Sequence, residues 1–322
     1  MLMKAVEQIF WLGRYLERLD DTARLVIATS HLLMDSHEET QFGWPVLLEV
    51  LGQSAPRLLA PYADAHGRLS LADTERAVMA LLINEADSPV SILATSAALK
   101  RNARSLRPLL PREMWEELNA LDLFLRDSCS QTVSRQQRYQ LMAEVSRRCQ
   151  MVIGVLDGTM LRGDAFDLLN MGRHLERADM TTRIMDVMVL QQLQPTQIKR
   201  PKFRWISLLN ALGGVESYQR FVAAQTRDVD AIDYLLACAD FPRSISYCFN
   251  RIAASAKQLP HASAIADSLL RVQQQVKSGA LSELSTVQLH GLIDELQTGI
   301  IDLHHVILSP CFAINAAQQR SA

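Results

Sequence analysis

The amino-acid sequence predicts an all-α protein built from two homologous helical halves. Apolar residues recur every three or four positions through most of the chain, which is the period of an amphipathic helix. No stretch of useful length alternates with period two, and no hairpin turn signal separates β-branched runs, so strands are not expected. A charged motif near the N terminus recurs in the middle of the chain, which indicates an internal duplication.

The repeated motif occupies residues 13–24 and 172–183. Its first copy reads Gly-Arg-Tyr-Leu-Glu-Arg-Leu-Asp-Asp-Thr-Ala-Arg and its second Gly-Arg-His-Leu-Glu-Arg-Ala-Asp-Met-Thr-Thr-Arg. Eight of the twelve positions are identical, whereas average residue usage would give about one match by accident. Most of the shared residues are charged, so the repetition preserves more than an apolar stripe.

The first half begins with a long helix over about residues 3–34, whose apolar stripe includes Leu12, Leu16 and Leu19. A short helix is expected within residues 44–52, which have a proline in the first turn and end on a glycine. Residues 56–67 contain two prolines and a glycine and are interpreted as a loop. Helix-start residues then predict further helices over about 70–83, 88–107, from 111, and 134–161.

The second half repeats this plan after Gly163. Its long helix, over about residues 164–192, carries the second motif copy. Residues 205–213 match 44–52 at Trp, Leu, Leu, Leu and Gly, and Phe-Pro-Arg-Ser-Ile at 241–245 matches Ser-Pro-Val-Ser-Ile at 88–92. The three pairs follow the same order at offsets of 159, 161 and 153 residues. We therefore expect two helical bundles, residues 1–163 and 164–322, packed about a pseudo-twofold axis.

The overall composition excludes several classes of protein. A formal charge of -2 does not suggest a nucleic-acid or anionic-membrane surface. The longest uncharged apolar run, residues 77–83, is far shorter than the ~18 residues of a membrane span, and no export signal is expected. The five cysteines lack a Cys-x-x-Cys pair, which favours a reducing cytoplasm over a disulfide framework or a zinc ribbon. The basic stretch at residues 199–204 is interpreted as a linker, and the basic row at residues 100–107 as a solvated face.

The charged face of the repeated helix is the candidate site. On a helical wheel the charges of the first copy fall within a sector of about 120° opposite the leucine stripe. Apolar residues interrupt this sector in both copies, so we expect the helix to be contacted on both sides. The shared charged residues that carry the hypotheses are Arg14, Arg18, Arg24, Arg173, Arg177, Arg183, Glu17 and Glu176.

Three interpretations of these charges remain open. They form a structural ion-pair network, or a site in which guanidinium groups hold a carboxylate or phosphate, or a catalytic site in which Glu17 or Glu176 transfers protons. Two helix starts offer further anion-binding candidates, because free N–H groups in a first turn attract anions. These candidates are Ser91, Ser244 and Arg243, and the two serines also fit a purely structural capping role.

No metal or cofactor is expected. The sequence lacks paired Glu-x-x-His spacing, His-Glu-x-x-His, Gly-x-Ser-x-Gly and the two phosphate-binding glycine motifs. The adjacent histidines His304 and His305 point apart on a helix and are interpreted as having no function.

The motif residues resemble the alpha-E family, a bacterial all-helical family named for its Glu-Arg motif. The resemblance rests on Trp-Leu-Gly-Arg-Tyr-Leu-Glu-Arg at residues 11–18 and Leu-Glu-Arg-Ala-Asp-Met-Thr-Thr-Arg at 175–183, and it extends over essentially the whole chain. It places the Glu-Arg pairs at Glu17-Arg18 and Glu176-Arg177. The first copy has Leu-Asp-Asp where the family often has Ala-Glu-Asn.

The resemblance also implies partners. Such proteins are companions of circularly permuted ATP-grasp ligases and transglutaminase-like proteins, in systems that make or modify peptides. The leading hypothesis is therefore an accessory or substrate-binding component with an Arg/Glu-lined site for an acidic peptide or a phosphorylated small molecule. The alternatives are an enzyme acting on a carboxylate- or phosphate-bearing peptide-like substrate, and a purely structural scaffold.

Overall fold

The computed structural model is helical throughout, and no strand occurs in the residues that it describes. The predicted all-α fold is confirmed. The described residues are 3–35, 43–64, 66–129, 134–192, 206, 208–223, 231–259, 261–277 and 284–319. The basic stretch at 199–204 and Trp205, which begins the second Trp-to-Gly match, lie outside them.

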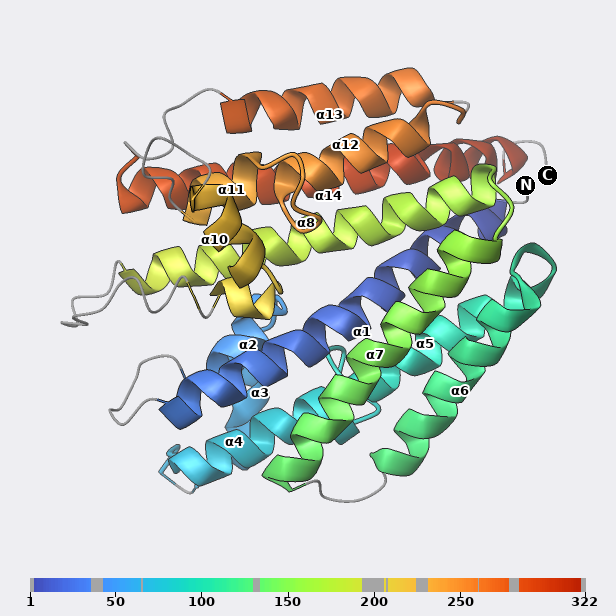
Figure 1. Cartoon of the computed structure of the whole chain (residues 1–322). Helices are drawn as coiled ribbons and strands as arrows, with labels where there is room; N and C mark the ends of the chain where they lie inside the picture. Colours follow the sequence, from blue (N-terminus) through green and yellow to red (C-terminus); the bar gives the residue numbers. More distant parts are fainter. Residues whose placement is uncertain are drawn as a thin grey trace.

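One bundle is formed by the long helices of the first half. Helix α1 (Met3–Asp35) packs against α5 (Ile92–Ser105) and α7 (Arg135–Thr159), and α6 (Arg112–Ser128) completes the bundle by packing on α5 and α7. The leucine stripe of α1 is fully buried, as its spacing predicts. Figure 1 shows these helices in the lower part of the molecule.

A second bundle is formed by α8 (Asp164–Gln192), α12 (Ile245–Ala256), α13 (Ala262–Lys277) and α14 (Thr286–Gln319), shown in the upper part of Figure 1. Helix α8 packs against α12 and α14, and α13 packs on both of them. Helices α1 and α8 also pack extensively on each other, so the two motif-bearing helices form the centre of the molecule. The predicted boundary at residue 163 lies in the connection between α7 and α8.

Helices α1 and α8 cross at the first residue of each motif copy. A Cβ atom added to Gly13 would lie 2.1 Å from the carbonyl oxygen of Leu169, and one added to Gly172 would lie 2.1 Å from that of Phe10. The two contacts are reciprocal, because Phe10 and Leu169 each precede the glycine of their own helix by three residues. Only glycine lets the two backbones approach this closely.

Short elements connect the long helices, and they correct parts of the sequence interpretation. The expected loop at 56–67 contains α3 (Ala55–Leu59) and the 3-10 helix η1 (Ala60–Tyr62), because prolines are compatible with the first turn of a helix. The expected helix over 70–83 is α4 (Leu71–Met79) followed by a π-helical turn, η2 (Ala80–Asn84). The remaining connecting elements are α2 (Pro45–Val50), η3 (Arg107–Leu109), α10 (Val215–Ala223) and α11 (Ala231–Ala237).

Candidate functional site

A buried network of arginines and carboxylates joins α1 to α8, and we call it the central network. Its first centre is Glu17, which is fully buried. Arg177 donates from Nε to Oε1 at 2.7 Å and from Nη2 to Oε2 at 2.8 Å, a bidentate pair. Nη2 of Arg243 lies 3.1 Å from Oε1, and Nε of Arg173 lies 3.9 Å from Oε2. Both oxygens of Glu17 are therefore occupied by guanidinium groups.

The second centre is Glu176, which is 2% exposed. Nε of Arg14 donates to Oε2 and Nε of Arg18 donates to Oε1, each at 2.5 Å. Arg14 also donates to Asp179 at 3.1 Å and has its Nη1 3.3 Å from Nδ1 of His304. The Glu of each motif copy thus pairs with the Arg that follows the Glu in the other copy.

A third cluster surrounds Arg243 in the turn before α12. Arg243 donates from Nη1 to Oδ1 of Asp21 and from Nη2 to Oδ2 of Asp20, the latter at 2.8 Å. Asp20 also accepts from Ser146 of α7 at 2.5 Å and from Nε of Arg24 at 2.9 Å. The second oxygen of Asp21, Oδ2, is buried and has no hydrogen-bond partner among the described residues. This cluster brings together three elements, α1, α7 and the turn before α12.

Burial and charge act in opposite directions on the carboxyl pKa values of the network. Burial alone would raise the pKa of Glu176, but the charges of Arg14 and Arg18 outweigh it and lower the pKa to about 2. The same balance at Glu17, set by Arg177 and Arg243, holds its pKa well below the usual range. Both glutamates are therefore ionised at neutral pH, and neither is suited to exchange a proton.

Two other groups of the network have shifted pKa values. Burial raises the pKa of Asp21 to about 7 despite the charge of Arg243, and the nearby charges of Glu17 and Asp20 act in the same direction. Burial, followed by the charge of Arg14, lowers the pKa of His304 to about 4, so this imidazole is neutral at pH 7.

The described network contains more positive than negative groups. Its seven arginines are Arg14, Arg18, Arg24, Arg173, Arg177, Arg183 and Arg243, and its five carboxylates are Glu17, Asp20, Asp21, Glu176 and Asp179. Arg18, Arg24 and Arg183 lie at the rim, with side chains 29%, 24% and 32% exposed. The network is therefore most accessible to a ligand at this rim, because buried charge must be paired.

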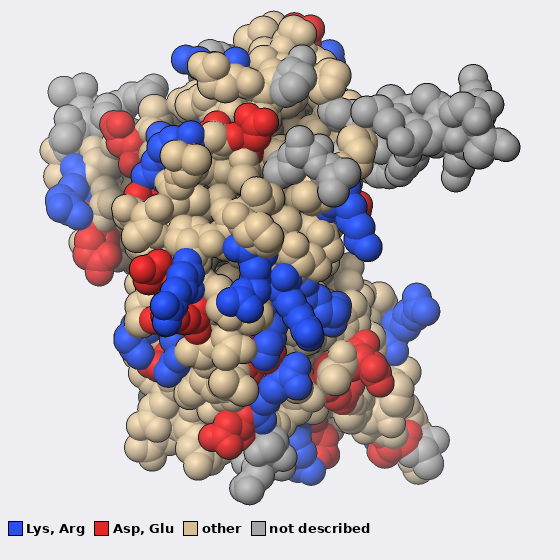
Figure 2. All heavy atoms as spheres, turned by 90° about the vertical axis from the view of Figure 1, so that its right-hand side faces the viewer, with Lys and Arg blue, Asp and Glu red and all other residues tan. Residues whose placement is uncertain are grey.

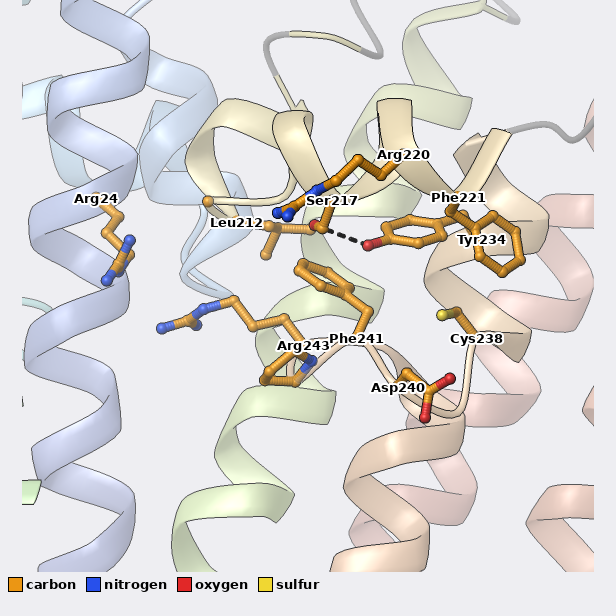
Figure 3. A pocket seen from close by; sticks show the side chains of 12 residues that line it. Arg24, Leu212, Ser217, Arg220, Phe221, Tyr234, Cys238, Asp240, Phe241 and Arg243 are labelled. Atoms are coloured by element: carbon orange, nitrogen blue, oxygen red, sulfur yellow. Dashed lines mark hydrogen bonds between the residues drawn. The ribbon is translucent and has the colours of Figure 1, made fainter. Parts of the chain in front are cut away.

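A cavity of about 480 Å³ adjoins the network where Arg24 and Arg243 reach its edge. Figure 3 shows their guanidinium groups and that of Arg220 from α10 pointing into the space between α1 and α10. The rings of Phe221, Tyr234 and Phe241 line the other side, and Tyr234 donates its hydroxyl to Ser217 at 2.8 Å. The cavity thus has one cationic wall and one aromatic wall.

Comparison with known proteins agrees with this Glu-Arg geometry. A family model described as a predicted alpha-helical domain with a conserved ER motif, Alpha-E, matches residues 1–310. The chain belongs to the Alpha-E family. It is similar to the uncharacterized proteins Rv2567 of Mycobacterium tuberculosis and Mb2597 of Mycobacterium bovis, each 22% identical over 330 residues. The alignments cover 98% of this chain and 37% of each relative, so the chain spans little more than a third of their length. No solved structure matches the chain.

The two helix-start serines of this Alpha-E chain are buried caps. Ser91, and not Ser88, caps α5 by accepting from the backbone of Leu93 at 3.1 Å, and Ser244 caps α12 by accepting from Tyr247 at 3.0 Å. Each hydroxyl also donates to the carbonyl of a preceding segment. Neither serine is exposed, so the cap geometry accounts for both, and anion binding by these hydroxyls stays a prediction.

The arginines that end the two motif copies contact glycines. A Cβ atom added to Gly52 would lie 2.3 Å from Nη1 of Arg183, and a Cβ atom added to Gly213 would lie 3.1 Å from Nη1 of Arg24. Both glycines have positive φ, +75° and +63°, and each follows the end of a short helix. Each arginine thus reaches the end of a short helix in the opposite half, where exposed carbonyls favour a cation.

The basic row at residues 100–107 is only partly the solvated face that the sequence predicts, because Lys100 is half-buried and donates to the buried Asp122 at 2.7 Å. Arg101, Arg104 and Arg107 are exposed, and the guanidinium of Arg107 lies 5.1 Å from the ring centre of Trp115. Figure 2 shows Lys and Arg side chains gathered near the middle of the face that lies on the right of Figure 1. Within the described part of the chain, no hydrogen bond or ion pair joins Arg101, Arg104 or Arg107 to the central network.

In the described part of the chain, two clusters of three side chains each have the spacing of metal ligands. Glu17, Asp20 and Asp21 bring ligand atoms within 4.8 Å of one another, but the guanidinium of Arg243 already contacts all three. Asp186 and His290 form a pair at 2.6 Å beside Asp294. No helix among the described residues is both long enough and apolar enough to cross a membrane.

Sequence reasoning missed three residues of this site. His304, interpreted as having no function, contacts Arg14 and packs against the rings of Phe10 and Trp11. Ser146 and Arg220 were not candidates. Nothing in the local sequence marks them, because they reach the site through the packing of α7, α10 and α14 and not through a motif.

Proposed function

We propose that this chain is an accessory or substrate-binding component of an ATP-grasp-linked system for peptide synthesis or modification, acting in the cytoplasm. It binds an anionic group of its substrate, an acidic peptide or a phosphorylated small molecule, at the rim of the central network. The motif resemblance supports the link to a circularly permuted ATP-grasp ligase and a transglutaminase-like protein.

The observation that carries the binding role is the arginine surplus at the cavity. Arg24 and Arg243 reach the cavity from the network, and Arg220 joins them from α10. Among the described lining residues Asp240 is the one carboxylate, and Figure 3 places it at the end away from Arg24. Forked guanidinium groups on one wall of a concave site suit a carboxylate or phosphate ligand.

The geometry favours binding over catalysis by Glu17 or Glu176. A general acid or base needs a pKa near the working pH and a free lone pair or proton within reach of the substrate. Both glutamates have lowered pKa values, and their oxygens are held by arginines beneath the surface. An enzyme acting through these carboxylates would first have to break the network that joins its two central helices.

We also propose that the two halves arose by duplication and pack about a pseudo-twofold axis. Three reciprocal contacts support this. Gly13 and Gly172 approach each other's helix in the same way, the two Glu-Arg pairs are exchanged between copies, and Arg24 and Arg183 reach the equivalent glycines of opposite halves. The helix order of the two bundles is also the same.

Co-purification with an ATP-grasp ligase encoded beside it tests the accessory role. We expect a complex, and we expect product formation by the ligase to rise when this chain is added. Arg220→Gln should weaken this stimulation of the ligase. Arg57 is an exposed arginine on α3, and Arg57→Gln should leave the stimulation unchanged. Turnover of peptides or amides by the purified chain alone, lost in a Glu17→Gln variant that circular dichroism shows to be folded, would refute the accessory proposal in favour of the enzyme.

A further inference from the structure

We infer that the cavity beside Arg24 recognises a single carboxylate attached to an apolar or aromatic side chain, as at the C terminus of a peptide that ends in such a residue. This inference rests on the proposed function, because it assumes that the arginine rim binds an anion. It adds the chemical class of the ligand and names the groups that select it.

The cationic wall is assembled from three separate elements. Arg24 comes from α1, Arg220 from α10 and Arg243 from the turn before α12, and Figure 3 shows their guanidinium groups directed into one space. Arg24 and Arg243 share Asp20 within the network. The one hydrogen bond that the described structure gives Arg220 runs from Nε to the carbonyl of Glu216 at 3.3 Å, which leaves its terminal nitrogens for a ligand.

The aromatic wall consists of rings that pack on one another, and the Tyr234 hydroxyl, the polar atom on these rings, is already hydrogen-bonded. The rings of Tyr234 and Phe241 stack with centres 4.9 Å apart, and Phe221 packs on Tyr234 at 5.1 Å. The Tyr234 hydroxyl is engaged by Ser217, so the three rings offer apolar surface to the cavity. Aromatic walls of this kind prefer apolar or aromatic ligand groups over charged ones.

Two of the three arginines, Arg220 and Arg243, have no charged counterpart at the aligned positions of the other half, whereas Arg24 is repeated as Arg183. In the motif alignments, Val90 stands at the position of Arg243 and Met180 at that of Asp21. At the offset that aligns residues 44–52 with 205–213, Leu59 stands at the position of Arg220. Apolar residues therefore stand at the positions equivalent to Arg243, Asp21 and Arg220, which favours a ligand-binding role for Arg220 and Arg243.

The volume and the charge distribution limit the ligand. A volume of about 480 Å³ lies within the roughly 300–1,000 Å³ of small-molecule sites and has room for one or two amino-acid residues. Asp240 lies at the opposite end of the lining from Arg24 and would repel a second anionic group. A monocarboxylate with an apolar body fits this division better than a polyphosphate does.

The test is a calorimetric titration of the full chain with a short neutral peptide that ends in phenylalanine, supplied as the free acid and as the C-terminal amide. We expect the acid to bind on the order of tenfold or more tightly than the amide, since the amide cannot form charge-assisted hydrogen bonds. Arg220→Gln and Phe221→Ala should each weaken binding of the acid by a similar factor. Arg57→Gln is the matched control and should bind as the wild type does, and circular dichroism confirms that each variant is folded.

The outcomes separate this inference from the proposed function. Equal binding of acid and amide would overturn the inference. Binding of inorganic phosphate or of an acidic peptide that depends on Arg220 and is insensitive to Phe221→Ala would also overturn it, while the anion-binding role would stand. If the folded chain bound none of the three probes, both proposals would fail.

Discussion

The approach of α1 and α8 at Gly13 predicts a large loss of stability in Gly13→Ala. The new Cβ would lie 2.1 Å from the Leu169 carbonyl oxygen, so the helices must separate by about 1 Å to reach the 3.0 Å below which real Cβ contacts are not found. The obstacle is backbone, which no change of rotamer relieves. Overpacking usually costs about 1–3 kcal/mol, and separation also lengthens the ion pairs of Glu17, one turn away. Alanine returns about 1 kcal/mol of helix propensity, which leaves about 0–2 kcal/mol from overpacking. Breaking a buried ion pair costs about 3–5 kcal/mol, so a partial loss of the Glu17 pairs raises the expected net loss to about 3 kcal/mol.

Urea unfolding followed by far-ultraviolet circular dichroism measures this loss. Gly172→Ala should behave like Gly13→Ala, because the two contacts are reciprocal. Gly154→Ala is the matched control: Gly154 is an exposed glycine of α7 with no atom within 4 Å of an added Cβ, so alanine should stabilise the protein by about 0.5–1 kcal/mol. If Gly13→Ala were as stable as Gly154→Ala, the close crossing and the argument built on it would be wrong.

Three further predictions concern the central network. Glu17→Gln should lower the free energy of unfolding by about 3–5 kcal/mol, since it leaves buried guanidinium charge uncompensated, whereas Glu116→Gln, in an exposed pair, should change it by at most about 0.5 kcal/mol in the same urea assay. Arg243→Val alone should be strongly destabilising, because it leaves the Asp21 carboxylate without its partner. Adding Asp21→Met reproduces Val90 and Met180, the residues at the aligned positions, and should recover at least half of the loss. A double variant no more stable than Arg243→Val would contradict this. The third is pH dependence. The folded-state pKa of Glu176 is lowered to about 2, so its contribution is present above its ordinary pKa and lost as pH falls toward 2, by about 3 kcal/mol. Asp21 has the opposite effect. Its pKa is raised to about 7, so its ionisation destabilises the fold, and the wild type should lose stability as pH rises from about 4 to 7. Asp21→Asn cannot ionise there, so this variant should not show that loss.

The fold class and the long helices could be predicted from the sequence because apolar periodicity is a local property. The burial of the charged sector was also indicated, through apolar residues such as Phe10 that interrupt it. The partners of each charge could not be predicted. The i, i+4 pair of Arg24 with Asp20 is readable from spacing, but the pairs of Glu17 with Arg177 and of Glu176 with Arg18 depend on the crossing point of two helices about 160 positions apart. Arg220 depends on the packing of α10, which no motif marks.

The reciprocal contacts of the network distinguish structural charges from functional ones. The exchanged Glu-Arg pairs occur on both sides of the crossing, next to glycines that allow only one depth of approach, so they set how α1 and α8 meet. A register role of this kind explains buried ion pairs better than stability does, because an apolar pair of similar volume is often at least as stable. Asp21 and Arg243 align with Met180 and Val90, which are not ionic, and Arg243 joins Arg24 in connecting the network to the cavity wall. The negative charge of a ligand at that wall would therefore act directly on Asp20 and Asp21, the two aspartates that pair with Arg243. Ligand binding should raise the proton affinity of the network on the Asp21 side and leave that of Glu176 unchanged.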